Sequence, residues 1–281
     1  MTQTPTSALD ILFEDNHLLV VNKPAGLPTM GTPGDRATLL TVAKNYIREK
    51  YAKPGNVYLG IVSRLDAPTT GVVVLARTSK AARRLTEQFR SGTPRKIYWA
   101  IVEGVMEPAE DECEDYLADD ERHRKMHIVG PGMPGAKAAR LRYRRLALLE
   151  ADNSPRKGDW SGQRNSFGRT KTPAGRVGVS THAPPGHDSW LEVELLTGRK
   201  HQIRLQMSER GHPLLGDRKY GATSRFERGI ALHARSLTIR HPVGGTELRL
   251  IAPVPACWPR AVTQRNTEPP CNTDSAKEGR S

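Results

Sequence analysis

The chain has 281 residues, 37% of them hydrophobic, which is enough to build a substantial core. Its 43 lysines and arginines outnumber 30 acidic residues, and the resulting net charge of +13 favours a polyanionic partner such as nucleic acid. Three scattered cysteines argue against a disulfide framework or a zinc site, and no apolar run could span a membrane, so we expect a cytoplasmic protein.

Residues 11–104 predict a sheet with two helices. Strands are expected at 11–13, 18–24, about 61–62, 72–77 and 96–104. The run VVVLAR at 72–77 is typical of a strand that is buried within a sheet. Helices are expected at 35–51 and from Ser79, as the N-cap, through Phe89.

The second half of the chain predicts further strands around a long insertion. Strands are expected at 137–149, 190–198, 231–240 and 246–252, and a helix at 200–210 that ends at Gly211. Residues 151–188 are rich in Gly, Ser, Pro, Arg and Lys and predict a flexible insertion. We therefore expect a flexible start at 1–10, one catalytic domain at 11–261 and a disordered tail at 262–281.

The tripeptide Arg64-Leu65-Asp66 is the first candidate for chemistry. A carboxylate at the end of a strand, followed by a turn of small residues, can be held rigidly while it faces a cleft. Taken alone, however, Asp66 could equally cap the turn, Tyr98 could be a core tyrosine, and Arg204 could lie on a solvated helix. The tripeptide therefore needs support from other parts of the chain.

That support comes from four sequence blocks, which occur in a fixed order. They are NKPAGLPT at 22–29, SRLDAPTTGVVVLART at 63–78, KIYWAIVEG at 96–104 and LLTGRKHQIRLQMSERGHPLLGDRKYGA at 195–222. Together with LHARSLTIRHPVGG at 232–245, they resemble the RluA-type pseudouridine synthases over roughly residues 11–258. The resemblance implies an α+β fold, with a mixed, mostly antiparallel sheet flanked by helices and a basic cleft. It also implies a cofactor-independent isomerase that acts on uridines in tRNA or rRNA.

The resemblance assigns roles to individual residues. Asp66 matches the family's nucleophile, Tyr98 the tyrosine that stacks under the target uracil, and Arg204 the basic residue that pairs with the aspartate. Arg64 matches the arginine that enters the RNA stack where the flipped uridine had been. The chemistry agrees with this assignment, because a buried carboxylate needs a nearby cation to stay ionised.

Residue spacing adds an expectation about each element that carries these residues. Helical spacing places His201, Arg204, Leu205 and Ser208 on one face, and we assign His201 and Leu205 to the surface that contacts RNA. In the strand at 96–104, Tyr98 points away from the more apolar side. Stacking of the tyrosine ring on the flipped base would add on the order of 1–3 kcal/mol to binding.

Ser63 stands where this family commonly has His, and Lys23-Pro24 and Gly71 are expected to shape turns near the site.

Other interpretations of the sequence remain open. The chain could be an RNA-binding or chaperone protein that has kept the fold without turnover. A hydrolase of nucleosides or glycosides would be expected to use paired carboxylates or an activated water. We expect a monomer with RNA as its partner and no metal centre.

Overall fold

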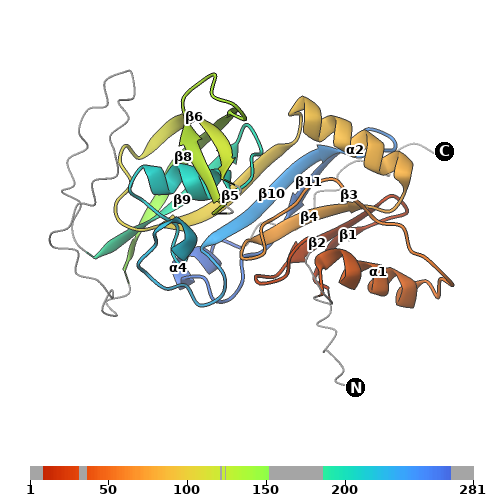
Figure 1. The fold of residues 1–281 in the computed structure, drawn as a ribbon. Helices are drawn as coiled ribbons and strands as arrows, with labels where there is room; N and C mark the ends of the chain where they lie inside the picture. The colour runs from red at the N-terminus through yellow and green to blue at the C-terminus, as the bar shows by residue number, and fades with distance from the viewer. Residues whose placement is uncertain (1–8, 32–36, 121, 124, 152–185, 267–281) are drawn as a thin grey trace, which may run out of the picture. The chain divides into compact units, whose positions relative to one another are not determined.

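The computed structural model describes residues 9–31, 37–120, 122–123, 125–151 and 186–266 (Figure 1). The expected flexible start and insertion lie mostly outside these residues, at 1–8 and 152–185. The first residues of the tail expected from 262 are ordered, because Val262 is fully buried in a short helix. The rest of that tail, from 267, lies outside the described residues.

The described residues form eleven strands and four α-helices. The strands are β1 (Ile11–Glu14), β2 (Leu18–Lys23), β3 (Gly60–Ile61), β4 (Thr70–Ala76), β5 (Arg95–Val102), β6 (Glu110–Asp120), β7 (Lys125–Val129), β8 (Lys137–Glu150), β9 (His187–Leu195), β10 (Leu232–Arg240) and β11 (Glu247–Ile251). The helices are α1 (Leu39–Lys50), α2 (Ser79–Ser91), α3 (Gln202–Glu209) and α4 (Arg260–Thr263), with one 3-10 turn, η1, at Arg218–Tyr220.

The chain separates into two compact units. The first consists of Met1–Trp99 together with Glu227–Ser281, and the second of Ala100–Phe226. Strand β5 begins in the first unit and ends in the second. The single catalytic domain expected over residues 11–261 stays a prediction.

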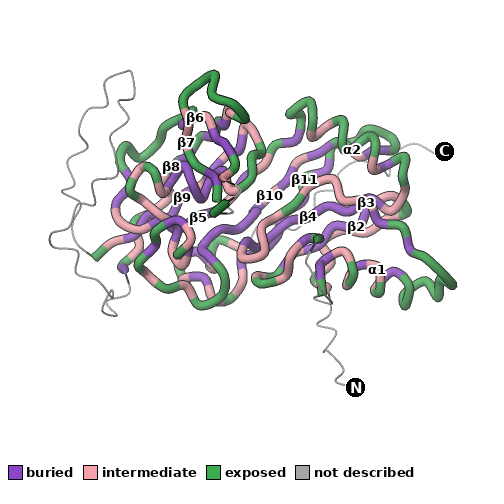
Figure 2. The backbone as a smooth tube through the Cα atoms, viewed as in Figure 1, coloured by how far each residue is buried: buried purple, intermediate pink, exposed green. Residues whose placement is uncertain are grey.

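In the first unit, the strands follow the order β1-β2-β4-β10, with β3 beside β4 and β11 beside β10. Strands β4 and β10 run parallel, whereas the β1/β2, β2/β4, β3/β4 and β10/β11 pairs are antiparallel. Helices α1 and α2 cover opposite faces of the β2/β4 pair (Figure 1). Side chains of a strand alternate between faces, so β4 is buried along its whole length, as Figure 2 shows.

Threonine side chains cap helices α1 and α2 of the first unit. The hydroxyl of Thr38 accepts from the backbone N–H of Thr41 at 3.2 Å and begins α1. The hydroxyl of Thr78 accepts from the backbone N–H of Ala81 at 3.1 Å and begins α2. The N-cap of α2 is therefore Thr78, one residue before the predicted Ser79, because only Thr78 has the extended backbone that a cap needs.

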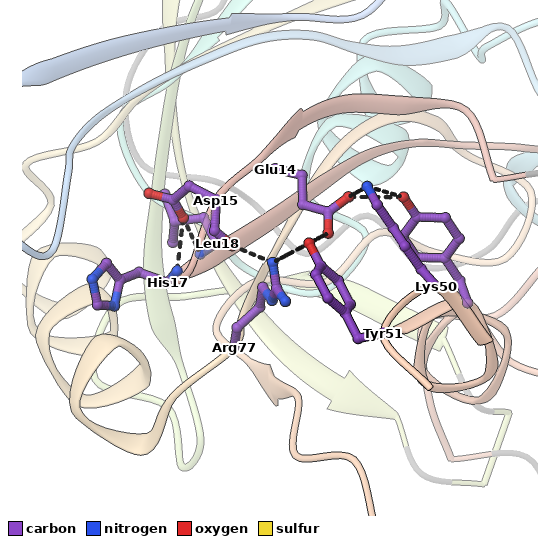
Figure 3. A network of polar contacts seen from close by, with 8 residues as sticks. Glu14, Asp15, His17, Leu18, Lys50, Tyr51 and Arg77 are labelled. Carbon is purple, nitrogen blue, oxygen red and sulfur yellow. Dashed lines mark hydrogen bonds and ion pairs between the residues drawn. The ribbon is translucent and has the colours of Figure 1, made fainter. Parts of the chain in front are cut away.

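A charged network fastens the end of α1 to β1 and to the end of β4 (Figure 3). Its centre is the carboxylate of Glu14, whose side chain is 9% exposed. This carboxylate accepts from the hydroxyls of Tyr46 at 2.8 Å and Tyr51 at 2.7 Å, from Lys50 Nζ at 2.7 Å and from Arg77 Nη1 at 3.1 Å. Burial alone would raise the pKa of Glu14, but the hydrogen bonds from Lys50, Tyr51 and Tyr46 outweigh it and lower that pKa.

Replacing Glu14 by Gln is expected to cost about 1–3 kcal/mol of unfolding free energy at neutral pH, because the charged acceptor is lost. The lowered pKa means that wild-type Glu14 is stabilising above the usual carboxyl pKa and loses this advantage as the pH falls. Urea unfolding of both proteins between neutral and acid pH measures the difference. Glu87→Gln is the control, since Glu87 pairs with Arg90 at the surface and should matter little. Equal effects of the two substitutions would contradict a stabilising role for the network.

In the second unit, the strands follow the antiparallel order β9-β8-β6-β7. Helix α3 packs Leu205 into a cluster with Leu117, Met126, Ala139 and Tyr220. Neither β6 nor β7 was predicted. In β6, acidic residues dominate the sequence EDECEDYLADD and hide the pattern of a strand. Cys113, Asp115 and Leu117 are nevertheless buried on alternate positions, which is the signal that could have revealed the strand.

The exposed side of this second sheet carries rows of opposite charge. Arg142 of β8 lies between Glu112 of β6 and Glu194 of β9 in the strand register. Glu112 accepts from Arg142 at 2.8 Å and from Arg140 at 3.1 Å. Arg140 and Arg142 of β8 are therefore paired with a carboxylate of the neighbouring strand β6.

Candidate active site

Asp66 lies on a short loop between β3 and β4 of the first unit. The loop turns tightly, since the backbone N–H of Thr69 donates to the Asp66 carbonyl at 3.1 Å, and β4 begins at Thr70. Asp66 is partly buried, whereas Arg64 is exposed. The loop thus places Asp66 shortly before the first residue of β4, a strand that is buried along its whole length.

The residue that follows Asp66 is fixed by the NKPAGLPT block. Lys23, which is completely buried, donates from Nζ to the carbonyls of Pro24 at 2.8 Å, Leu27 at 2.8 Å and Ala67 at 3.1 Å. The backbone N–H of Gly26 also donates to the Ala67 carbonyl at 2.8 Å. Lys23 therefore shapes its own turn, as predicted, and also ties that turn to the Asp66 loop.

The residue that precedes Asp66 is fixed by the end of the same block. The hydroxyl of Thr29 donates to the Leu65 carbonyl at 2.8 Å and accepts from the Leu65 backbone N–H at 3.2 Å. Thr29 is 3% exposed. Both neighbours of Asp66 are thus held by the segment 23–29.

Close backbone contacts from β10 and from the residues just before it support the loop and the start of β4. Gly71 has a φ of +113°, and a Cβ on it would lie 2.3 Å from the carbonyl oxygen of Ala234. A Cβ on Gly229 would likewise lie 2.3 Å from the carbonyl oxygen of Pro68, which also accepts from the N–H of Ile230. Glycine is required at both positions, because any side chain would push the loop away from its support.

Buried His233 of β10 completes this support. Its Nε2 lies 3.0 Å from the Ala252 carbonyl, which can only accept, so Nε2 carries the proton. Its Nδ1 then accepts from the hydroxyl of Thr70 at 2.8 Å. Burial lowers the pKa of His233 to about 4, with a further contribution from the positive charge of Arg235.

The lowered pKa of His233 predicts a loss of stability in mild acid. The neutral ring is the form that fits, so its contribution is complete above the usual pKa of 6.5 and is lost as the pH falls towards 4. The loss amounts to about 3 kcal/mol. A His233→Gln variant should be less stable at neutral pH but should lack this dependence, which urea unfolding at a series of pH values measures. Parallel pH profiles of the two proteins would contradict the assignment.

Tyr98 and Lys23 both respond to the charge of Asp66. Burial raises the pKa of the Tyr98 hydroxyl above its usual range, and the Asp66 carboxylate raises it further. Burial lowers the pKa of Lys23 to about 8, and the Asp66 carboxylate opposes this shift. Along β5, Ile97 and Trp99 are buried while Tyr98 is partly exposed, which agrees with the predicted alternation up to Trp99, beyond which the strand is buried on both sides. The first unit thus brings Asp66, Tyr98 and Lys23 together.

Arg204 lies in the second unit, on α3, and its guanidinium is held by Asp217. Nε donates to Asp217 Oδ2 at 2.7 Å and Nη2 to Oδ1 at 2.8 Å, and the two side chains are 6% and 1% exposed. The guanidinium also lies over the ring of Tyr220, 5.1 Å from its centre. The pairing of Arg204 with Asp66 stays a prediction. Asp217 belongs to the recognised block at 195–222, but its spacing alone gave no indication of this partner.

The other residues predicted on α3 have mainly internal contacts. His201 precedes the helix with a left-handed φ of +54°, and its Nδ1 lies 2.7 Å from the Tyr220 hydroxyl. Leu205 is 2% exposed within the cluster of the second unit. Burial does not single out one face of this helix, because every residue from Gln202 to Met207 is buried. The contact of His201 and Leu205 with RNA stays a prediction.

Two features of the described residues bear on other functions. Across residues 9–31, 37–120, 122–123, 125–151 and 186–266, no group of three or more His, Cys, Asp or Glu side chains could hold a metal ion. Among the helices built by these residues, none has the length and apolar character needed to cross a membrane.

Comparison with known proteins identifies the family. A family model described as RNA pseudouridylate synthase matches residues 17–209. The Dual-specificity RNA pseudouridine synthase RluA of Haemophilus influenzae is 32% identical over 84% of this chain and 89% of its own length. The Uncharacterized RNA pseudouridine synthase slr1629 of Synechocystis is 32% identical over 88% of this chain, which spans only 66% of that relative.

A solved structure agrees with the fold. Human RNA Pseudouridylate Synthase Domain Containing 4 matches with a TM-score of 0.63 and 24% identity, over 92% of each chain. The chain therefore belongs to the RNA pseudouridylate synthase family. The predicted RluA-type resemblance and the mixed, mostly antiparallel sheet are confirmed.

Proposed function

We propose that the protein isomerises uridines in tRNA or rRNA to pseudouridine, with Asp66 as the nucleophile. The supporting observation is that Asp66 lies on a loop whose neighbouring residues are both fixed, within electrostatic reach of Tyr98. The names of relatives add support, since they include tRNA pseudouridine synthase C and a dual-specificity RNA pseudouridine synthase. The product is an isomer of the substrate, so the reaction consumes no group donor and no oxidant or reductant.

The proposed reaction balances without a redox step. The bond between the ribose anomeric carbon and N1 of uracil breaks, the base turns, and a bond to C5 forms. The hydrogen of C5 leaves as a proton, and N1 gains one. The carboxylate of Asp66 can attack the anomeric carbon or the ring, or assist formation of a glycal intermediate.

Three further residues receive roles in this proposal. Tyr98 stacks under the base with its hydroxyl protonated, and burial moves the pKa of that hydroxyl further above neutral pH. Exposed Arg64 enters the RNA stack after the uridine has flipped. It thereby offsets part of the free energy lost when the base is unstacked and unpaired, which is about a few kcal/mol. Arg204 keeps the nucleophile ionised.

Release of tritium from RNA labelled at C5 of uridine tests this proposal. A pseudouridine synthase releases the label as water while the base stays attached to the RNA. An RNA-binding protein without turnover would release neither label nor base, and a hydrolase would release labelled free uracil. Either of these two results with total RNA from a deletion strain would reject the proposed function.

A further inference from the structure

We infer that the hydroxyl of Thr29 is a positioning group for Asp66, an inference that rests on the proposed function. The hydroxyl contacts Leu65 rather than the reacting atoms, so it acts through the backbone. It serves as donor to the Leu65 carbonyl at 2.8 Å and as acceptor for the Leu65 N–H at 3.2 Å. One side chain thus bonds both backbone groups, the N–H and the C=O, of the residue that precedes the nucleophile.

Thr29 can do this because it is itself held firmly. Its carbonyl accepts from the backbone N–H of Leu40 at 3.2 Å. The carbonyl of Pro28 accepts from the backbone N–H of Leu39 at 2.8 Å. These bonds join the threonine to the first turn of α1, whose apolar side is buried against the sheet. The hydroxyl therefore transmits the position of a packed helix to the Asp66 loop.

The two flanking contacts together fix the backbone on both sides of Asp66. Leu65 is held by Thr29, and Ala67 is held by Lys23 and Gly26. Asp66 is the single residue between these fixed points, so its backbone dihedral angles have little freedom. Catalytic groups need such placement, because a shift of about 1 Å can slow a reaction roughly 100-fold.

The decisive comparison uses Thr29→Val and Thr29→Ser. Valine keeps the volume of threonine but can bond neither Leu65 group, whereas serine keeps the hydroxyl. We expect Thr29→Val to slow tritium release at saturating enzyme roughly 10- to 100-fold. Its RNA affinity, measured by filter binding, should be unchanged. Thr29→Ser should react at a rate close to that of the wild type.

Thr78→Val is the matched control for general destabilisation. Thr78 caps α2 at the far end of β4 from Asp66, so its loss should lower the melting temperature without slowing the reaction at saturation. If Thr29→Val does not fold, Thr29→Cys takes its place. It is similar in size to serine but has a weaker hydrogen-bonding group, so it should react more slowly than Thr29→Ser.

Each outcome decides the inference. A wild-type rate in Thr29→Val, or in Thr29→Cys where that variant replaces it, would overturn the role of Thr29. Equal slowing of Thr29→Ser would do the same, because the hydroxyl would then not be the active part. Asp66→Asn, assayed alongside, separates the two levels. An inactive Asp66→Asn with a fast Thr29→Val rejects only the positioning role, whereas an active Asp66→Asn rejects the nucleophile and this inference with it.

Discussion

Asp66→Asn is expected to abolish release of tritium from C5-labelled RNA while folding and RNA affinity stay nearly intact. The amide has the shape of the carboxylate but cannot act as an anionic nucleophile. The turn itself should persist, because the contact between Thr69 and residue 66 uses only the backbone. Single-turnover assays at saturating enzyme, together with filter binding, separate chemistry from affinity.

A surface carboxylate provides the control for this experiment. Asp119 pairs with Lys200 at 2.8 Å in the second unit, and its side chain is 45% exposed. Asp119→Asn should therefore leave both rate and affinity unchanged. Substantial turnover by Asp66→Asn would remove Asp66 from the mechanism.

Asp217→Ala is expected to lower the unfolding free energy by about 3–5 kcal/mol. The substitution leaves the guanidinium of Arg204 buried without the carboxylate that now holds it by two hydrogen bonds. Both side chains are almost fully buried, so water cannot replace the lost partner without a rearrangement of α3 and η1. Urea unfolding measures the change.

A double substitution distinguishes a lost pair from a lost packing contact. Arg204→Met combined with Asp217→Leu removes both charges of the pair, and it should recover most of the stability, because neither charge is then buried without the other. Asp119→Ala, which breaks an exposed pair, should cost about 1 kcal/mol or less. A similarly small cost for Asp217→Ala would show that the buried pair contributes little.

The sequence predicts the fold best where burial is regular. The apolar run in β4 and the alternation in β5 are direct consequences of which faces are covered, and both were predicted. Strand β6 was missed because its exposed face is crowded with acidic residues, which hide an alternating pattern. Local capping was misplaced by one residue, since Thr78 and Ser79 are chemically equivalent candidates.

In the candidate site, the proposed reacting residues could be predicted from the sequence, whereas the contacts that hold them could not. Asp66 and Tyr98 could be predicted because they belong to recognisable blocks. The contacts that hold Asp66 could not, because Thr29 and Leu65 are 36 positions apart and the hydroxyl of Thr29 has no distinguishing pattern. The partner of Arg204 depends on how η1 folds back towards α3, which no local periodicity encodes.

The paired charges on the second sheet limit how the protein can be held by a polyanion. Arg140 and Arg142 are already compensated by Glu112, and Arg144 by Glu192. Phosphate groups that approached this side would have to compete with carboxylates already in place, and few counterions would be released. These three paired arginines therefore add little to the net charge of +13. For an RNA substrate, the salt dependence of binding should report on other basic residues of the chain, and neutralising Arg140, Arg142 and Arg144 should barely change its slope.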